Sequence, residues 1–141
     1  MVFDKSINVD FLNEIGQSSM SGFLDIQFIE SGEDYLIASM PVDHRTKQPM
    51  GLLHGGASVV LAETVGSVAS FCLAENPMKD KVVGIEINAN HLRGVKEGKV
   101  FAKVTPIKIG RTLHVWNIDI TNDEGDMICI SRLTTMIIKN E

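Results

Sequence analysis

The alternation of hydrophobic and polar positions along the chain predicts a short helix, two strands, a long helix and four further strands. Residues 8–17 place their apolar side chains on one side of a helix, which could cover the edge of a sheet. Segments 23–31 and 34–42 are rich in the branched and aromatic residues typical of strands. The Ser-Gly-Glu-Asp tract between them predicts a hairpin turn.

Segment 55–74 predicts a long helix that is apolar nearly all the way round. It contains no proline, and Asn76-Pro77 follows it as a stop signal. A helix without a broad polar face must be buried, so we expect other elements to enclose it.

The rest of the chain alternates as strands over residues 82–92, 99–109, 112–121 and 127–138. Only short turns separate these segments, and a parallel crossover would need a dozen or more residues, so the strands should be antiparallel neighbours. The sequence therefore predicts an α+β fold, with one antiparallel sheet curved around one central helix and a single domain over residues 1–141.

Composition narrows the function classes. The 141 residues carry a net charge of −5, which argues against a protein that grips duplex nucleic acid. The two cysteines form no Cys-x-x-Cys pair, so we expect a reducing, cytoplasmic location. Residues 1–17 contain acidic side chains and no unbroken apolar run, so they predict neither a signal peptide nor a membrane span.

Glu63 is the first candidate for chemistry, because it stands alone in the middle of an apolar helix. Burying a carboxylate is costly unless the group is paired or useful. Ser67 lies one turn later on the same face, within reach as a hydrogen-bond partner. Glu63 is therefore either a catalytic carboxylate or part of a narrow polar stripe that faces solvent or a partner subunit.

The second candidate is the sequence His54-Gly55-Gly56 at the start of the long helix. The first amides of a helix have no intrahelical acceptor and carry partial positive charge, so they can hold the developing oxyanion of an acyl-transfer step. Alternatively, the glycines only mark an ordinary helix entry. The four histidines contain no His-x-x-x-His pair, so no metal site is expected, and His114 should be a core or interface residue.

Together these residues resemble a known family. The stretch from Gln48 to Gly56, followed by Glu63 and Ser67, is similar to the hotdog-fold acyl-CoA thioesterases of the PaaI-like branch, in the 4-hydroxybenzoyl-CoA thioesterase subgroup. The similarity runs from about Phe23 to Ile138. It implies a hotdog fold and hydrolysis of acyl-CoA thioesters with aromatic or cyclic acyl groups, such as 1,4-dihydroxy-2-naphthoyl or hydroxybenzoyl. The former substrate would imply a role in menaquinone biosynthesis.

The resemblance also assigns roles to the candidate residues. Glu63 would be the catalytic carboxylate, acting as nucleophile or as general base. The backbone N–H of Gly55 would bind the thioester carbonyl, while Gln48 and His54 complete or orient this polarising group. Ser67 would position the water or the carboxylate.

For coenzyme A, which belongs to the substrate, the resemblance points to two loops and to cationic partners for its phosphates. These residues are His91, Arg93, Lys108, Gly110 and Arg111. No cofactor, metal, nucleic acid or membrane partner is implied.

Helix geometry adds a constraint on assembly. Gly55 and Glu63 are eight positions apart, or about 12 Å along a helix axis, whereas reacting atoms approach to about 3–3.5 Å. If both residues serve one substrate, Glu63 must come from a neighbouring chain, and the dimer is the catalytic unit. The family resemblance implies such intersubunit sites and tetramers built from two dimers.

Two other activities compete with hydrolysis. One is a hotdog enoyl-CoA hydratase or dehydratase. Such relatives generally use an Asp/His pair, and here no such histidine stands beside Glu63. The other is a non-catalytic acyl-CoA-binding module.

Overall fold

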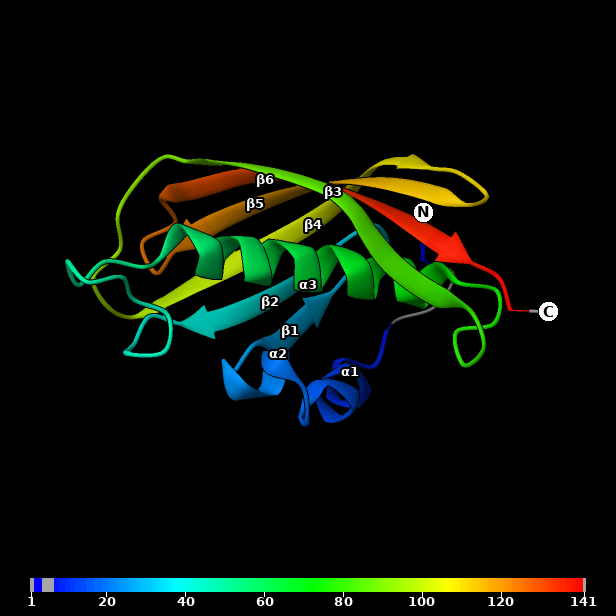
Figure 1. Ribbon diagram of the computed structural model, residues 1–141, viewed down its shortest axis with the longest axis horizontal. Coiled ribbons are helices and arrows are strands. Elements are labelled where there is room, and N and C mark those ends of the chain that lie inside the picture. Colours follow the sequence, from blue (N-terminus) through cyan, green and yellow to red (C-terminus); the bar gives the residue numbers. More distant parts are fainter. Residues whose placement is uncertain (1, 4–6, 141) are drawn as a thin grey trace.

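The computed structural model describes residues 2–3 and 7–140 and has the expected α+β architecture (Figure 1). A long helix lies across one face of a six-stranded antiparallel sheet, and two short helices lie beside its first strand. In chain order the elements are α1 (Val9–Gly16), α2 (Met20–Phe23), β1 (Gln27–Ser31), β2 (Leu36–Pro41), α3 (Gly55–Leu73), β3 (Lys81–His91), β4 (Lys99–Ile109), β5 (Leu113–Asn122) and β6 (Met127–Ile138).

The strand order is β1-β2-β4-β5-β6-β3, and every neighbouring pair is antiparallel. The predicted antiparallel sheet is thus confirmed, but the expectation that segments 82–92 and 99–109 are neighbours is wrong. Strand β3 pairs with β6, whereas β4 lies between β2 and β5. Residues 92–98 form no hairpin turn, because they run past the start of α3, where the Leu53 N–H donates to the Val95 carbonyl at 2.8 Å. The two edges differ: α1 packs on β1, where Asn13 Nδ2 donates to the Phe28 carbonyl at 3.0 Å and Asn13 Oδ1 accepts from the Phe28 N–H at 2.7 Å. Strand β3, by contrast, pairs only with β6 within the described chain, so its outer edge is open.

Helix α3 ends within one residue of its predicted boundary, but the single chain does not enclose it. One face is buried, with residues spaced three and four apart as a helix face requires: Ser58, Leu61, Ala62, Val65, Gly66, Ala69 and Ser70. The opposite side, which includes Val59, Val60 and Phe71, is only half-buried. The sheet therefore covers one face of the central helix, as predicted, and leaves the apolar side chains of the opposite face half-buried in the single chain. By length and composition α3 could also cross a bilayer, a test that buried core helices pass as well.

One predicted strand begins too early. Residues 23–26 were expected to start the first strand, but the chain forms the short helix α2 up to Phe23, and β1 starts only at Gln27. Between them, Asp25 takes a left-handed backbone conformation with φ of 56°, which breaks any extended run. The apolar residues Leu24 and Ile26 are buried as expected of a strand, but they are placed by a turn.

A buried polar cluster fixes α3 on the sheet. Ser70 Oγ accepts a hydrogen bond from Trp116 Nε1 at 2.7 Å, and it is bonded to Thr135 Oγ1 at 2.7 Å and to His114 Nδ1 at 3.0 Å. All four side chains are at most 2% exposed. The expectation of a core histidine at position 114 is confirmed, and because its neighbours lie on α3, β5 and β6, the cluster sets the rotation of the helix relative to the strands.

Candidate active site

The N-terminus of α3 leaves one backbone donor free. His54 is the N-cap, and its Nδ1 accepts from the Gly56 N–H at 2.8 Å. The His54 carbonyl accepts from Ala57 at 3.0 Å and Ser58 at 3.3 Å. Among the described residues nothing accepts a hydrogen bond from the Gly55 N–H, so this amide is available to an external acceptor at the positive end of the helix.

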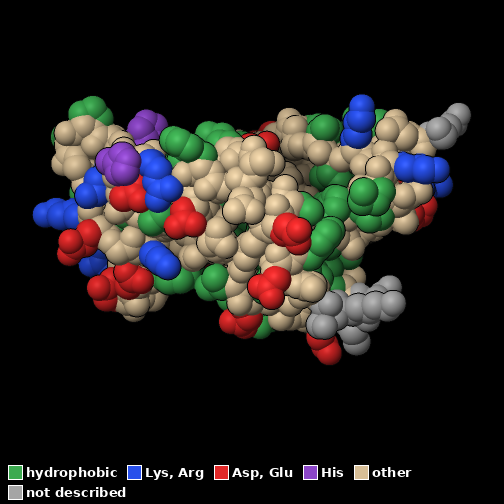
Figure 2. Space-filling model, turned by 90° about the horizontal axis from the view of Figure 1, so that it is seen from below, with side chains coloured by type: hydrophobic (Ala, Val, Ile, Leu, Met, Phe, Trp, Pro, Cys, Tyr) green, Lys and Arg blue, Asp and Glu red, His purple; other side chains and the backbone are tan. Residues whose placement is uncertain are grey.

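Gly55 opens into a cleft of about 370 Å³ between the loop before α3 and the end of β3. A Cβ at Gly55 would lie 2.8 Å from His91 Nε2, so a larger residue there would require the exposed His91 side chain to move. Four of the predicted site residues line this cleft together, namely Gln48, Gly55, His91 and Arg93. Histidine side chains beside Lys and Arg side chains are visible at this end of the molecule in Figure 2.

Gln48 lines the cleft from a tight loop. Its Oε1 accepts from the Met50 N–H, and its backbone N–H donates to the Leu52 carbonyl at 2.8 Å. Gly51 closes this turn with φ of 82°, a conformation that favours glycine. Since Oε1 is occupied, the Nε2 hydrogens of Gln48 remain as donors for a ligand.

An ion pair braces the same loop from its N-terminal side. Arg45 Nη2 lies 2.6 Å from Asp43 Oδ2, and the hydrogen bonds from Arg45 lower the pKa of Asp43 to about 2. Thr46, which is 1% exposed, accepts from the Asp43 N–H at 3.0 Å and donates to the Pro41 carbonyl at 2.9 Å. The loop that carries Gln48 is therefore ordered by its own hydrogen bonds.

Glu63 is half-buried and lies elsewhere on α3. Its carboxylate contacts β3 at Gly84, where an added Cβ would overlap Glu63 Oε1. No described residue donates a hydrogen bond to this carboxylate, and the hydrogen bond to Ser67 that the spacing allows is not formed. Glu63 is about 12 Å from Gly55 along the helix axis, so one chain does not bring the two together.

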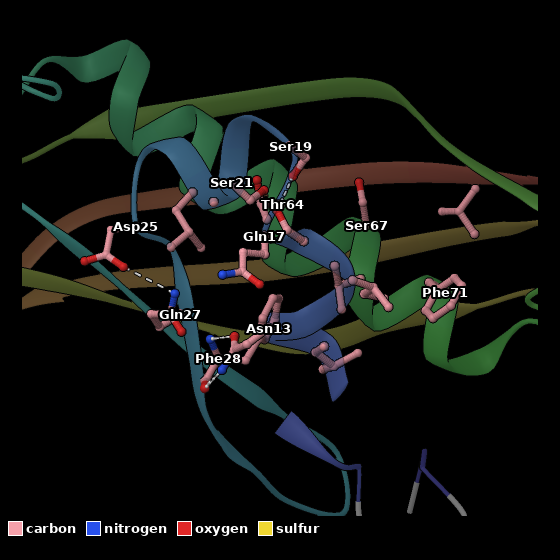
Figure 3. Close-up of a pocket in the computed structure, with 17 residues that line it drawn as sticks. Asn13, Gln17, Ser19, Ser21, Asp25, Gln27, Phe28, Thr64, Ser67 and Phe71 are labelled. Carbon is pink, nitrogen blue, oxygen red and sulfur yellow. Dashed lines mark hydrogen bonds between the residues drawn. The ribbon is translucent and has the colours of Figure 1, made fainter. Parts of the chain in front are cut away.

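Ser67 lines a different cleft, of about 430 Å³, between α3 and the α1–α2 segment. Figure 3 shows side chains of α3 on one side and of α1 and β1 on the other. The α3 side contributes Thr64, Ser67, Val68 and Phe71. The walls combine apolar side chains with hydroxyl and amide groups, which suits a ring that carries polar substituents.

The predicted coenzyme residues fall into separate places. His91 and Arg93 lie at the N-terminal end of α3, where Arg93 Nη1 pairs with Asp126 Oδ2 at 2.7 Å. Gly110 and Arg111 line a pocket of about 420 Å³ beside Leu73, at the C-terminal end of the helix. Lys108 is exposed on β4.

Neither cysteine is prepared to act as a nucleophile. Burial raises the pKa of Cys72 to about 11 and also raises the pKa of Cys129. Both thiols therefore stay protonated near neutral pH, and only the thiolate is reactive. Within the described residues, no group of three or more His, Cys, Asp and Glu side chains is arranged to hold a metal.

Comparison with known proteins identifies the family. Residues 50–129 match the model of the thioesterase superfamily. The chain belongs to the thioesterase superfamily. It is 51% identical over 138 residues to 1,4-dihydroxy-2-naphthoyl-CoA hydrolase of Escherichia coli, covering 98% of this chain and 100% of that relative.

Solved thioesterases share the whole fold. A thioesterase from Pseudomonas aeruginosa, crystallised as a glutamine-to-alanine variant, has a TM-score of 0.95 at 44% identity, covering 99% of this chain and 100% of the other. A thioesterase from Haemophilus influenzae has a TM-score of 0.92 at 48% identity, covering 99% and 96%. The predicted family, the hotdog fold and the enzyme class are confirmed.

Sequence reasoning predicted the free amide at Gly55 but missed the residues that hold α3 and Glu63 in place. Ser70 and Thr135 were not singled out, since a hydroxyl on an apolar helix face has no signal unless its partners are known. Gly84 was also missed, because its contact with Glu63 joins segments that are far apart in the chain.

Proposed function

We propose that this thioesterase hydrolyses acyl-CoA thioesters with aromatic or cyclic acyl groups to the free acid and coenzyme A. The observation that carries the proposal is the free Gly55 N–H at the positive end of α3, opening into a cleft beside Gln48. Such a donor stabilises the negative charge that develops on the thioester carbonyl oxygen during acyl transfer. The cytoplasm supplies such substrates, and the reaction needs no cofactor.

In this mechanism the carbonyl oxygen accepts hydrogen bonds from the Gly55 N–H and from Gln48 Nε2. His54 keeps the Gly56 amide engaged, so that Gly55 is the donor presented to the substrate. Glu63 either removes a proton from the attacking water, or attacks the carbonyl carbon itself to form a mixed anhydride that water then hydrolyses. In both routes the C–S bond breaks, the coenzyme thiolate takes up a proton and the free acid is released. Ser67 positions the water or the carboxylate.

The open edge of β3 supports a dimer as the catalytic unit. This strand is 11 residues long, and its Ile85 side chain is 50% exposed. A long unpaired edge is a template for pairing with another chain. Antiparallel pairing of two β3 strands would run the two α3 helices in opposite directions. If the two-fold axis passes near Val59, midway between Gly55 and Glu63, Glu63 of one chain lies opposite Gly55 of the other. Two such dimers would form the tetramer expected from the family.

The same antiparallel arrangement would unite the separated coenzyme residues. If Glu63 of the partner chain faces Gly55, the C-terminal end of the partner's α3 lies about 15 Å beyond Gly55, ten residues further along. Arg111 of that chain would then stand on the same side as Arg93 of the first chain, where the phosphates at the end of the pantetheine arm can reach both. His91, Lys108 and Gly110 would complete this surface.

The relative from E. coli acts on 1,4-dihydroxy-2-naphthoyl-CoA, and we propose the same substrate here, with a role in menaquinone biosynthesis. The cleft beside Ser67 supports this choice, because its walls offer both apolar surface and hydroxyl or amide partners for ring hydroxyls. We propose that the acyl ring is bound in this cleft.

The test is a kcat/KM panel over dihydroxynaphthoyl, hydroxybenzoyl, phenylacetyl and medium-chain acyl-CoAs, with the released thiol trapped by a colour reagent. The proposal expects hydrolysis with the dihydroxynaphthoyl thioester most efficient. A flat panel would contradict the menaquinone role. Loss of enoyl absorbance without thiol release would indicate a hydratase, and binding without turnover would indicate a non-catalytic module.

A further inference from the structure

Beside Glu63, a glycine of α3 faces the sheet. Gly66 follows Glu63 by three positions on the buried face, and a Cβ there would lie 2.5 Å from Leu133 Cδ2 of β6. The missing side chain at Gly66 therefore lets the helix approach β6 and its neighbour β3 at this level. As a result the Glu63 side chain reaches the backbone of β3.

The residue that Glu63 meets on β3 is Gly84. A Cβ at Gly84 would overlap Glu63 Oε1 and would lie 3.3 Å from Glu63 Cδ and 3.6 Å from Leu133 Cδ1. The carboxylate thus occupies the space that any side chain at this position would need. Directly after Gly84 the register with β6 shifts, so a bulge follows the contact.

A left-handed backbone conformation does not explain why a glycine stands here, although the bulge that follows Gly84 is a place where glycine is common. Among the described glycines, only Gly51, Gly98 and Gly125 have the positive φ that favours this residue, and Gly84 is an ordinary strand residue opposite Thr135. Glycine in a strand interior weakens the strand and often marks a close approach of another group. The group that approaches Gly84 is the Glu63 carboxylate.

We propose that Gly84 is a positioning residue for Glu63: its bare backbone forms the seat that fixes where the carboxylate lies. The inference rests on the proposed function, in which Glu63 performs the reaction. A methyl group at position 84 would push the carboxylate off β3. Because the displaced atom is the end of a flexible side chain, the carboxylate can swing away at little cost to the fold, while its distance from the substrate changes.

The experiment is to measure kcat, KM and the thermal unfolding midpoint of Gly84→Ala. We expect kcat to fall by about 10²-fold, the effect of a misplacement of about 1 Å, while KM and the unfolding midpoint stay near wild type. A purely structural role would instead lower the unfolding midpoint together with activity, and would overturn the proposal. The control is Ile130→Ala on the neighbouring strand β6, whose side chain is 42% exposed and which should keep wild-type kcat.

Combining Gly84→Ala with a second substitution, Glu63→Asp, tests the contact between Gly84 and the Glu63 carboxylate directly. In Glu63→Asp the carboxylate is one methylene shorter and no longer reaches Gly84, so adding Gly84→Ala should change kcat by less than about twofold. An equal loss in both backgrounds would overturn the proposal, as would a fully active Gly84→Ala enzyme when Glu63→Gln is inactive. Failure of the proposed function looks different, because Glu63→Gln itself would then keep wild-type kcat.

Discussion

Replacing Ser70 by alanine should be among the most destabilising small changes in this protein. The substitution removes the oxygen that Trp116 Nε1, His114 Nδ1 and Thr135 Oγ1 share, in a site where every side chain is at most 2% exposed. A buried polar group left without a partner costs about 1–3 kcal/mol. In the described cluster Trp116 has no other acceptor, whereas His114 and Thr135 can turn to recover part of their hydrogen bonding. We therefore expect a loss of about 3 kcal/mol in the free energy of unfolding.

The assay is urea unfolding followed by Trp116 fluorescence, with thermal unfolding alongside. A loss of this size should lower the unfolding midpoint by roughly 10 °C in a domain of this length. The matched control is Ser131→Ala, because Ser131 is 1% exposed and makes a single bond, to the Asn88 carbonyl at 2.8 Å. It should cost about 1 kcal/mol. Equal losses in the two variants would refute the argument that the shared oxygen at Ser70 holds α3.

Three further predictions concern the reaction and the pH dependence of stability. Glu63→Gln, which keeps shape but removes the charge, should lower kcat by about 10²–10⁴-fold with little change in KM, and near wild-type turnover would reject a catalytic role. Arg93→Ala and Arg111→Ala should each raise KM and leave kcat near wild type, with an effect that shrinks as salt rises; unchanged KM in both would move the coenzyme site elsewhere. Burial lowers the pKa of His114, so the unfolded state binds this proton at a higher pH than the folded state does. The contribution of His114 to the free energy of unfolding is therefore complete above its ordinary pKa of about 6.5 and is lost as pH falls through the lowered value. His114→Gln should lack this part of the pH dependence in a denaturation series, and identical profiles would contradict it.

Long elements with clear boundary signals could be predicted from the sequence. The glycine pair and Asn76-Pro77 delimit α3, and the turns that contain Gly98, Gly110 and Gly125 delimit β4 and β6, whose observed bounds match the predicted ones. The start of β1 could not be predicted, because the branched and aromatic residues from Phe23 onward fit a strand equally well. The left-handed conformation of Asp25 closes α2 locally, because the Asp25 N–H donates to the Gly22 carbonyl at 3.1 Å and the Ile26 N–H to the Ser21 carbonyl at 2.9 Å. Glycine is the usual residue at such a helix end, so an aspartate there is a weak signal.

The candidate site divides in the same way. The free amide of Gly55 follows from the general rule that the first N–H groups of a helix lack intrahelical acceptors, so the sequence alone could predict it. The seat of Glu63 on Gly84 and the anchoring of Ser70 could not be predicted, since each depends on the register of strands far away in the chain. For the outer side of α3 the apolar sequence predicted burial, but no element of the single chain packs against that side closely enough to bury it.

The most direct test of the shared active site is complementation between two defective chains. A Glu63→Ala chain and a Gln48→Ala chain, each poorly active alone, are unfolded together and refolded as mixed dimers. In a mixed dimer one site combines the intact Gln48 of the first chain with the intact Glu63 of the second, and the other site collects both defects. Random pairing makes half of the dimers mixed, so activity should recover to about a quarter of wild type. A mixture no more active than the mean of its two parents would contradict the intersubunit site.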